Sequence, residues 1–202
     1  MDFEEIKKQT EAFVKEELFT LEPWILNVRW EEKLPKLNEL REKVKSKGLW
    51  LPQISKDYGG LGLTNAEHGE VSEILGASPY GHYCFNCQAP DAGNMEILIE
   101  FGTDQQKETY LYPLLKGEIR SCFAMTEPDH AGSNPVKMGT IAKKENGNYL
   151  INGHKWFTSG FDGSTFAIVM LVSDPENVIP HKKASQVIVP TSNKGLKFVR
   201  NV

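Results

Sequence analysis

The stretch from Arg120 to Ser133 holds the residues best suited to binding chemistry. The run Phe123–Met125 is apolar and predicts a short buried strand. The segment Pro128–Ser133 that follows favours a tight loop with free backbone N–H groups. Such a loop can hold phosphate oxygens, and the hydroxyl of Thr126 stands at the strand's edge. The pattern predicts an anion-binding loop, although an ordinary strand-to-turn exit has the same composition.

The composition of the 202-residue chain restricts its class. Hydrophobic residues make up 40% and charged residues 25%, which is typical of a globular protein of one or two domains. The net charge of -4 and the absence of long lysine clusters argue against a nucleic-acid partner. No apolar run has the length of a membrane span, and the N-terminal residues are acidic where a targeting signal would be basic. We therefore expect a cytoplasmic protein, with a mitochondrial or peroxisomal location as the alternative in a eukaryote.

Three cysteines raise the question of a metal or redox site. Cys84 and Cys87 form a C-x-x-C, and His82 extends it to a pattern that could begin a zinc site. A fourth ligand is missing, and the redox alternative requires a βαβ context that this segment lacks. We expect Cys84, Cys87 and Cys122 to be small buried residues and expect no metal.

The first part of the chain has the apolar spacing of α-helices. Residues 3–19 carry apolar side chains three and four positions apart, which predicts a helix. Pro23 is expected to interrupt it, and Trp24–Trp30 to form a second short helical piece. A further helix is expected to end at Gly48, because glycine favours a helix C-terminus.

Two capping boxes mark the starts of later helices. They are Thr64-x-x-Glu67 and Thr103-x-x-Gln106. The segment 91–101 between them keeps the helical period, whereas residues 78–90 are expected to be irregular. The pattern therefore predicts an N-terminal all-α helical bundle domain over residues 1–118.

From residue 119 onward the apolar period changes from 3.6 to two. Asn146-Gly147 lies between two alternating runs and predicts a hairpin turn. The expected strands are Met138–Lys144, Asn148–Ile151, His154–Ser159, Phe166–Val172 and Gln186–Val189. We therefore predict an α+β fold, in which the helical domain is followed by an antiparallel β-barrel or sandwich over residues 119–202 that is incomplete at its C-terminal end.

Several motifs in one order make the chain recognisable. Met-Thr-Glu-Pro, a loop ending in Gly-Ser, and then Asn-Gly-x-Lys-Trp-Phe-Thr-Ser-Gly resemble the acyl-CoA dehydrogenase family. Tyr58–Gly62 resembles the family's turn after its early helices, Phe101–Lys107 its stretch before the β domain, and Phe123–Ser133 its flavin loop. The likeness covers most of the chain, and the ordered set is far more specific than any one motif.

The resemblance implies an FAD-dependent oxidoreductase of fatty acid metabolism that acts on an acyl-CoA thioester. In the family a carboxylate removes the α-proton while the β-hydrogen leaves as hydride to flavin N5. Hydrogen-bond donors aimed at the ring then favour its reduction. The implied cofactor-binding residues are Phe123, Met125, Thr126, Gly132, Ser133, Phe157, Thr158 and Ser159.

The resemblance also implies a role for each part of that set. Thr126 matches the family's threonine at the pyrimidine edge of the flavin, and Phe123 and Met125 match main-chain contacts along the same strand. Ser133 matches the serine that reaches the FAD pyrophosphate and also borders the acyl-CoA. Phe157–Ser159 matches the segment that packs on the flavin face and binds near N5.

The sequence departs from the family pattern in three places. Phe157 stands where most members carry Trp, with Trp156 one position earlier, and Ser159 stands where Thr is usual. The loop Asp129–Gly132 is one residue longer than the common version, so the resemblance does not assign the donors to the pyrophosphate.

The resemblance places the catalytic glutamate in a C-terminal helical bundle beyond the point that matches Val202. The same bundle would supply further FAD contacts and the contacts of a homo-oligomer. We therefore expect no catalytic residue within this chain, a structural role for Glu127, and no activity of the 202 residues alone. An electron-transfer protein is the expected partner.

Two other functions remain open from the sequence. The same fold serves flavin-dependent monooxygenases, which have no need of an acyl-CoA base. The chain could also be a non-catalytic assembly module that exposes the apolar surface its bundle would cover.

Overall fold

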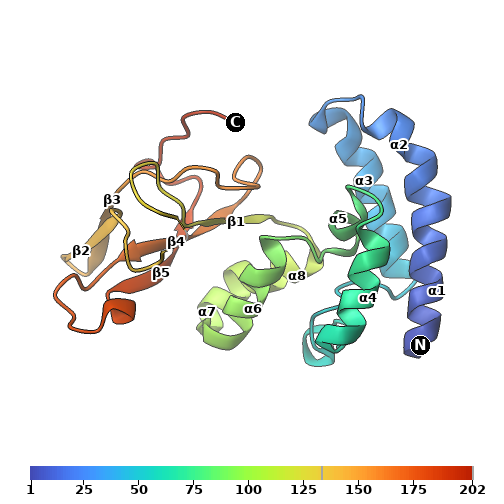
Figure 1. Cartoon of the computed structure of the whole chain (residues 1–202), viewed down its shortest axis with the longest axis horizontal. Coiled ribbons are helices and arrows are strands. Elements are labelled where there is room, and N and C mark those ends of the chain that lie inside the picture. The colour runs from blue at the N-terminus through green and yellow to red at the C-terminus, as the bar shows by residue number, and fades with distance from the viewer. Residues whose placement is uncertain (133, 202) are drawn as a thin grey trace. The chain divides into compact units, whose positions relative to one another are not determined.

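The computed structural model of the chain describes residues 1–132 and 134–201. It divides into two compact units, Met1–Ala92 and Gly93–Val202. The first unit is helical, and the second combines helices with a sheet (Figure 1). Among the described residues no helix is long and apolar enough to cross a membrane.

The first unit is built around the middle of its longest helix. Its elements are α1 (Phe3–Phe13), the π-helical segment η1 (Val14–Leu18), α2 (Phe19–Ile25), α3 (Trp30–Ser46), the short 3-10 helix η2 (Lys56–Tyr58), α4 (Asn65–Leu75) and α5 (Gly81–Phe85). Leu37, Leu40 and Val44 of α3 are completely buried. Phe13 and Phe85 meet edge to face in the same core, with ring centroids 5.4 Å apart. This core anchors α1, α3 and α5 together through apolar burial.

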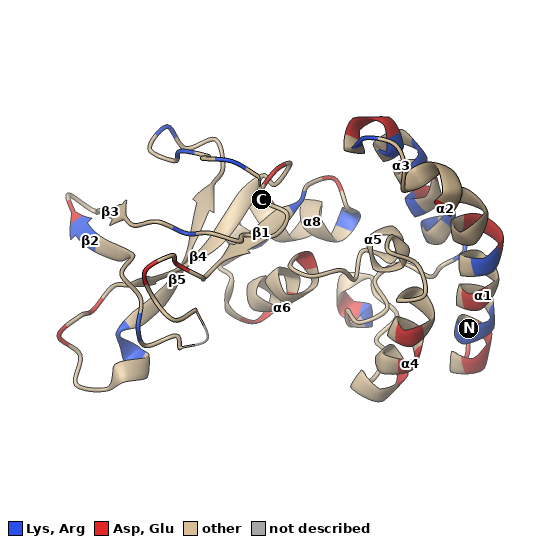
Figure 2. Ribbon diagram, turned by 45° about the horizontal axis from the view of Figure 1, so that its top comes forward, with Lys and Arg blue, Asp and Glu red and all other residues tan. Residues whose placement is uncertain are grey.

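Charged residues of both signs are spread along the helices of this unit (Figure 2). Lys7 of α1 bonds Glu70 of α4 at 2.6 Å, and Lys43 of α3 bonds Glu17 of η1 at 2.8 Å. Exposed ion pairs of this kind contribute little individually. They set which helices lie side by side more than they set stability.

The prediction that Pro23 interrupts the first helix is wrong. Pro23 lies inside α2, which continues to Ile25, and the turn comes after it. Leu18 and Ile25, on either side of the proline, are 2% and 1% exposed. Their burial stabilises the helix by more than the one hydrogen bond that proline removes.

Helices of the second unit precede its sheet. They are α6 (Asp91–Phe101), α7 (Asp104–Gln106), the π-helical segment η3 (Lys107–Leu111) and α8 (Tyr112–Lys116). Both predicted capping boxes are confirmed, at Thr64 with Glu67 and at Thr103 with Gln106. The predicted domain boundary at residues 118 and 119 stays a prediction.

The sheet is mixed and open. Its strands are β1 (Ser121–Ala124), β2 (Ile141–Glu145), β3 (Asn148–Asn152), β4 (Phe166–Val172) and β5 (Ala184–Pro190). β1 runs parallel to β4, β5 runs antiparallel to β4, and the β2–β3 hairpin joins the end of β4 through the parallel pair Ile141 and Val172. A short 3-10 helix, η4 (Pro180–Lys182), lies between β4 and β5.

The α+β class is confirmed, but two features of the sheet differ from expectation. β4 runs parallel to β1 instead of antiparallel, because the chain between them crosses back to the end of the sheet at which β1 begins. The expected strand His154–Ser159 does not form. Phe157 has φ of +48°, outside the extended region, so the segment cannot continue as a strand.

The two faces of the sheet have different cover. On one face Phe166 of β4 packs against Tyr110 of η3, with ring centroids 4.8 Å apart. On the other face Cys122, Ala167 and Leu171 form a small apolar cluster with partly buried Phe161. The candidate site lies at the end of β1 and in the loop segments between β1 and β4.

Candidate functional site

The end of strand β1 forms the first part of the candidate site. Phe123 lies in β1, in parallel register with Ile168 of β4, and its side chain is half-buried. Met125 and Thr126 come directly after the strand and are also half-buried. Main-chain groups at a strand end leave the hydrogen-bond ladder, so side chains or a ligand must satisfy them.

Two hydrogen bonds join Thr126, at this strand end, to Trp156, 30 residues later. Thr126 Oγ1 donates to the carbonyl oxygen of Trp156 at 2.6 Å. The backbone N–H of Trp156 donates to the carbonyl oxygen of Thr126 at 3.1 Å. The reciprocal pair holds the two segments side by side and brings Phe157 close to Thr126.

Thr126, Trp156 and Phe157 form what we call the junction, and Phe157 is its most exposed aromatic side chain. It is 61% exposed and Trp156 is 43% exposed, and their ring centroids are 4.7 Å apart. A bulky residue in the left-handed region of φ is uncommon and persists only where its surroundings fix it. The pair therefore exposes apolar ring surface, with the two ring planes tilted by 43° to each other.

Gly132 brings the loop after β1 back over Thr126. A Cβ atom at Gly132 would collide with the Cγ2 methyl of Thr126. The loop can therefore approach this closely only because residue 132 has no side chain. Ser133, the next predicted residue, lies outside the described residues, so its role stays a prediction.

Thr158 and Ser159 complete the predicted set. The carbonyl oxygen of Thr158 accepts a hydrogen bond from the Phe161 N–H at 3.2 Å, which closes a turn. Ser159 is exposed, two residues beyond Phe157. The structure thus brings Thr126, Gly132 and Phe157 together, while Ser159 lies at the edge of the group.

Beneath the junction lies a buried carboxylate. Glu127 is 4% exposed. Its Oε1 accepts from Lys155 Nζ at 2.8 Å and from the Thr140 N–H at 2.9 Å, and its Oε2 accepts from the Gly139 N–H. The Nδ1 atom of His130 lies 3.1 Å from the same Oε2. Both carboxylate oxygens therefore accept hydrogen bonds from groups of the chain.

These donors decide the protonation of Glu127. Burial alone would raise its pKa, but the hydrogen bonds from Lys155, Thr140 and Gly139 outweigh burial and lower the pKa to about 2. A carboxylate with such a low pKa, closed in by donors, is a poor acceptor for a substrate proton. The geometry favours a structural carboxylate.

Sequence reasoning missed Lys155 entirely. Its Nζ atom also donates to the carbonyl oxygen of Met125 at 2.8 Å, so it binds two consecutive parts of the strand end. Lys155 directly precedes the aromatic pair, and a lysine at a position with only 12% of its side chain exposed needs a partner. The sequence has many lysines, however, and contains no sign that this one is buried.

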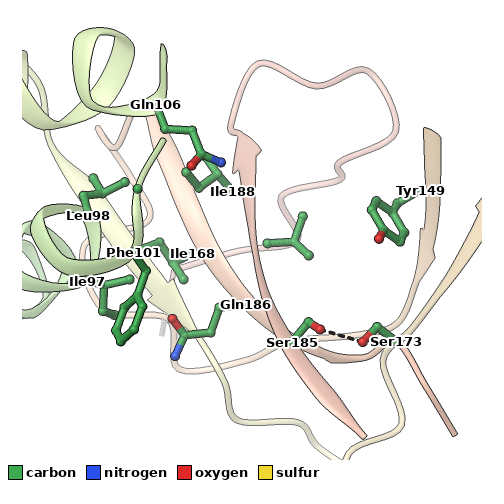
Figure 3. A pocket seen from close by; sticks show the side chains of 12 residues that line it. Ile97, Leu98, Phe101, Gln106, Tyr149, Ile168, Ser173, Ser185, Gln186 and Ile188 are labelled. Carbon is green, nitrogen blue, oxygen red and sulfur yellow. Dashed lines mark hydrogen bonds between the residues drawn. The ribbon is translucent and has the colours of Figure 1, made fainter. Parts of the chain in front are cut away.

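A cavity of about 610 Å³ opens elsewhere in the second unit, between α6, α7 and the sheet (Figure 3). Phe101 and Ile188 give it apolar walls, and Gln106 and Gln186 extend into it. Its described lining includes no acidic, basic or thiol side chain and none of the junction residues. Such a cavity can bind but offers no group for proton transfer or nucleophilic attack.

The cysteines lie in apolar surroundings. Burial raises the pKa of Cys84 and of Cys87 to about 12, so both thiols stay protonated at neutral pH. Protonated buried thiols are poor nucleophiles and poor metal ligands. In the part of the chain that the structure describes, no group of three or more His, Cys, Asp or Glu side chains could hold a metal ion.

A helical unit followed by a mixed sheet defines an α+β protein, whose loop after β1 folds over the strand end beside exposed aromatic rings. Comparison with known proteins gives the family. The acyl-CoA dehydrogenase N-terminal domain matches residues 2–118, and the acyl-CoA dehydrogenase middle domain matches residues 122–202. The chain belongs to the acyl-CoA dehydrogenase family.

Individual relatives are longer than this chain. Acyl-CoA dehydrogenase family member 10 of Mus musculus is 40% identical over 96% of this chain, which covers 19% of the mouse protein. A solved acyl-CoA dehydrogenase homologue from Mycobacterium abscessus is 33% identical with a TM-score of 0.92, over 99% of this chain and 53% of its own. The Bacillus anthracis acyl-CoA dehydrogenase complexed with FAD is 25% identical with a TM-score of 0.71, over 96% of this chain and 31% of its own.

Proposed function

We propose that this chain carries the flavin-ring site of an FAD-dependent acyl-CoA dehydrogenase, which oxidises an acyl-CoA thioester between its α and β carbons. The observation that carries the proposal is the junction of Thr126 with Trp156, beside the exposed ring of Phe157. At this junction the polar hydroxyl of Thr126 is bonded to Trp156, and the apolar ring of Phe157 is on the next residue of the chain. A planar ring system with polar edges requires that combination.

The residues of the junction fit a flavin. Thr126 Oγ1 uses its hydrogen toward Trp156, so its lone pairs can accept from an N–H group at the ring's pyrimidine edge. The exposed face of Phe157 can stack on the ring. The loop approaches Thr126 closely at Gly132, and the free backbone N–H groups of such a loop can bind a phosphate.

Bound FAD would supply the hydride acceptor of the reaction. Ser159 would donate a hydroxyl near the ring's reactive edge, and Phe157 would exclude water from one face. Phe123 and Met125 would contact the ring through their main chain. Because the Met125 carbonyl already accepts from Lys155, its contact would come from the N–H.

We assign no proton acceptor for the α-carbon to this chain. Glu127 directly follows Thr126, and Lys155 and two backbone N–H groups already bind its carboxylate. General-base help is typically worth about a hundredfold to ten-thousandfold in rate. We therefore expect the 202 residues alone to show no acyl-CoA oxidation. An acyl-CoA substrate, an electron-transfer protein as partner and a homo-oligomer are further parts of the proposal.

Titration of FAD fluorescence tests the proposal. The variants are Thr126→Val, Ser159→Ala and Phe157→Ala. A neutral hydrogen bond contributes about 0.5–1.5 kcal/mol, so each hydroxyl loss should raise Kd by about two- to tenfold. Phe157→Ala should weaken binding by about tenfold through lost stacking.

Matched controls separate this site from general damage. Thr109→Val removes a hydroxyl that also donates to a backbone carbonyl, at 2.8 Å. Ser192→Ala and Phe19→Ala remove an exposed serine and a 42% exposed aromatic that are not junction residues. These three should leave Kd unchanged. Equal binding by all six variants, or no FAD binding by the parent chain, would contradict the proposed site.

A further inference from the structure

The buried ion pair of Glu127 and Lys155 links three separate stretches of chain. Glu127 follows Thr126 at the end of β1, and its carboxylate accepts from the backbone N–H groups of Gly139 and Thr140. Lys155 directly precedes Trp156 and donates to both Glu127 and the Met125 carbonyl. The strand end, the far end of its loop and the aromatic segment therefore meet at one pair of charges.

The pair lies on the buried side of the junction, and the proposed flavin contacts lie on its open side. Glu127 is 4% exposed, whereas Phe157, two residues from Lys155, is 61% exposed. Thr126 directly precedes Glu127, Trp156 lies between Lys155 and Phe157 in the chain, and Thr126 and Trp156 are bonded to each other at 2.6 Å. A displacement of either charged side chain must shift the backbone that carries Thr126 and Phe157.

Packing alone does not explain why charges occupy this position. Apolar residues of similar volume often replace a buried ion pair without loss of stability, because desolvation offsets the attraction. An ion pair differs from apolar packing in direction: each hydrogen bond fixes an angle and a distance. Directional contacts suit a place where two segments must keep one relative position.

We propose that Glu127 and Lys155 are positioning residues that set the spacing between the Thr126 hydroxyl and the Phe157 ring for flavin binding. The inference rests on the proposed function for the identity of the ligand. Neither side chain touches the flavin. Their effect passes through the Met125 carbonyl and through the Thr126 and Trp156 hydrogen bonds.

Two measurements on the full chain test this. Amide hydrogen exchange, without flavin, reports how firmly the Trp156 and Thr140 N–H groups are held. FAD titration, with visible circular dichroism of the bound flavin at saturation, reports affinity and ring placement. The variants are Glu127→Gln, Lys155→Met and Lys155→Arg, and the matched controls are the exposed Glu145→Gln and Lys144→Met of β2.

We expect Glu127→Gln and Lys155→Met to speed exchange at Trp156, to raise the FAD Kd by about tenfold, and to change the flavin dichroism. Lys155→Arg keeps a cation beside Glu127 and should leave all three readouts close to the parent values. The control variants should change none of them.

The outcomes separate this inference from the proposed function. Unchanged exchange in both Glu127→Gln and Lys155→Met would overturn the positioning role whatever the flavin does. Faster exchange with unchanged FAD affinity and dichroism would overturn it as well, while leaving the flavin site intact. A parent chain that binds no FAD would overturn the proposed function, and the inference with it, even if exchange responds as expected.

Discussion

Both units of this protein bury charged side chains, and Arg41 and Glu127 show two different ways of holding a buried charge. Arg41 of the first unit is 3% exposed and lies between the rings of Trp50 and Tyr83, at 4.8 and 4.7 Å from their centroids. Glu127 of the second unit is 4% exposed and is held by Lys155 and by backbone N–H groups. The cation rests on aromatic faces, whereas the anion is enclosed by donors.

The difference shows what each charge does. Arg41 also donates to the Tyr83 carbonyl at 2.8 Å, so it joins α3 to α5 inside a sealed core. Glu127 joins a strand end to two loop segments whose outer side is open. A planar cation can serve as a packing element, because its faces are weakly hydrated. A carboxylate has no such face and fixes backbone positions through directed hydrogen bonds.

The largest expected effect comes from removing the cation of the second unit. Lys155→Met leaves the Glu127 carboxylate buried without its ion-pair partner, which typically destabilises by about 3–5 kcal/mol. Amide hydrogen exchange of β4 measures the stability of this unit by itself. The double variant with Glu127→Gln should recover most of the loss, because it removes the unpaired charge. A Lys155→Met chain as stable as the parent would show that the pair is dispensable.

Acidification should destabilise the second unit by protonating the carboxylate of Glu127. The pKa of Glu127 is lowered from 4.5 to about 2 by folding. Because folding lowers this pKa, the ionised carboxylate stabilises the folded state at pH values above its ordinary pKa. This contribution is lost as pH falls from about 4.5 to about 2. The shift corresponds to about 3 kcal/mol. Hydrogen exchange of β4 across this range should show the loss in the parent chain and a flatter profile in Glu127→Gln.

Arg41→Met should have a smaller effect, confined to the first unit. It removes two cation–π contacts and the hydrogen bond to Tyr83, for a loss of about 2 kcal/mol. Hydrogen exchange of α3 and α5 measures it, with Arg29→Met, whose side chain is 81% exposed, as the control. FAD affinity should stay unchanged. A weaker FAD affinity in Arg41→Met would remove the functional contrast between the two buried charges.

The smallest effects should come from the capping boxes, in which the two units are alike. Thr103→Ala removes the side chain that accepts from the Gln106 N–H at 3.2 Å, for a loss of about 1 kcal/mol. Thr64→Ala should likewise fray the start of α4. Thr109→Ala, inside a helix, is the control and should be neutral. Exchange rates in the first turns of α4 and α7 would reveal any difference between the units.

The helical unit could be predicted well because its information is local. Apolar spacing and the Thr64 and Thr103 caps depend on residues three and four positions apart, which one turn of helix brings together. Pro23 failed as a signal because the burial of Leu18 and Ile25 outweighs one missing hydrogen bond. Local rules set the helices, and tertiary packing decided where the first of them ended.

The sequence by itself identified most residues of the candidate site but not how they are arranged. The order of motifs named the flavin loop and the aromatic segment, and it pointed to Thr126, Gly132 and Phe157 as residues of one site. Sequence alone could not show that Lys155 turns inward to Glu127, since a lysine is exposed by default. Nor could it show that β1 and β4 run parallel, because strand direction follows from the route of the 40-odd residues between them. Pairing between distant segments is a property of the folded chain, and there the tertiary structure alone decided.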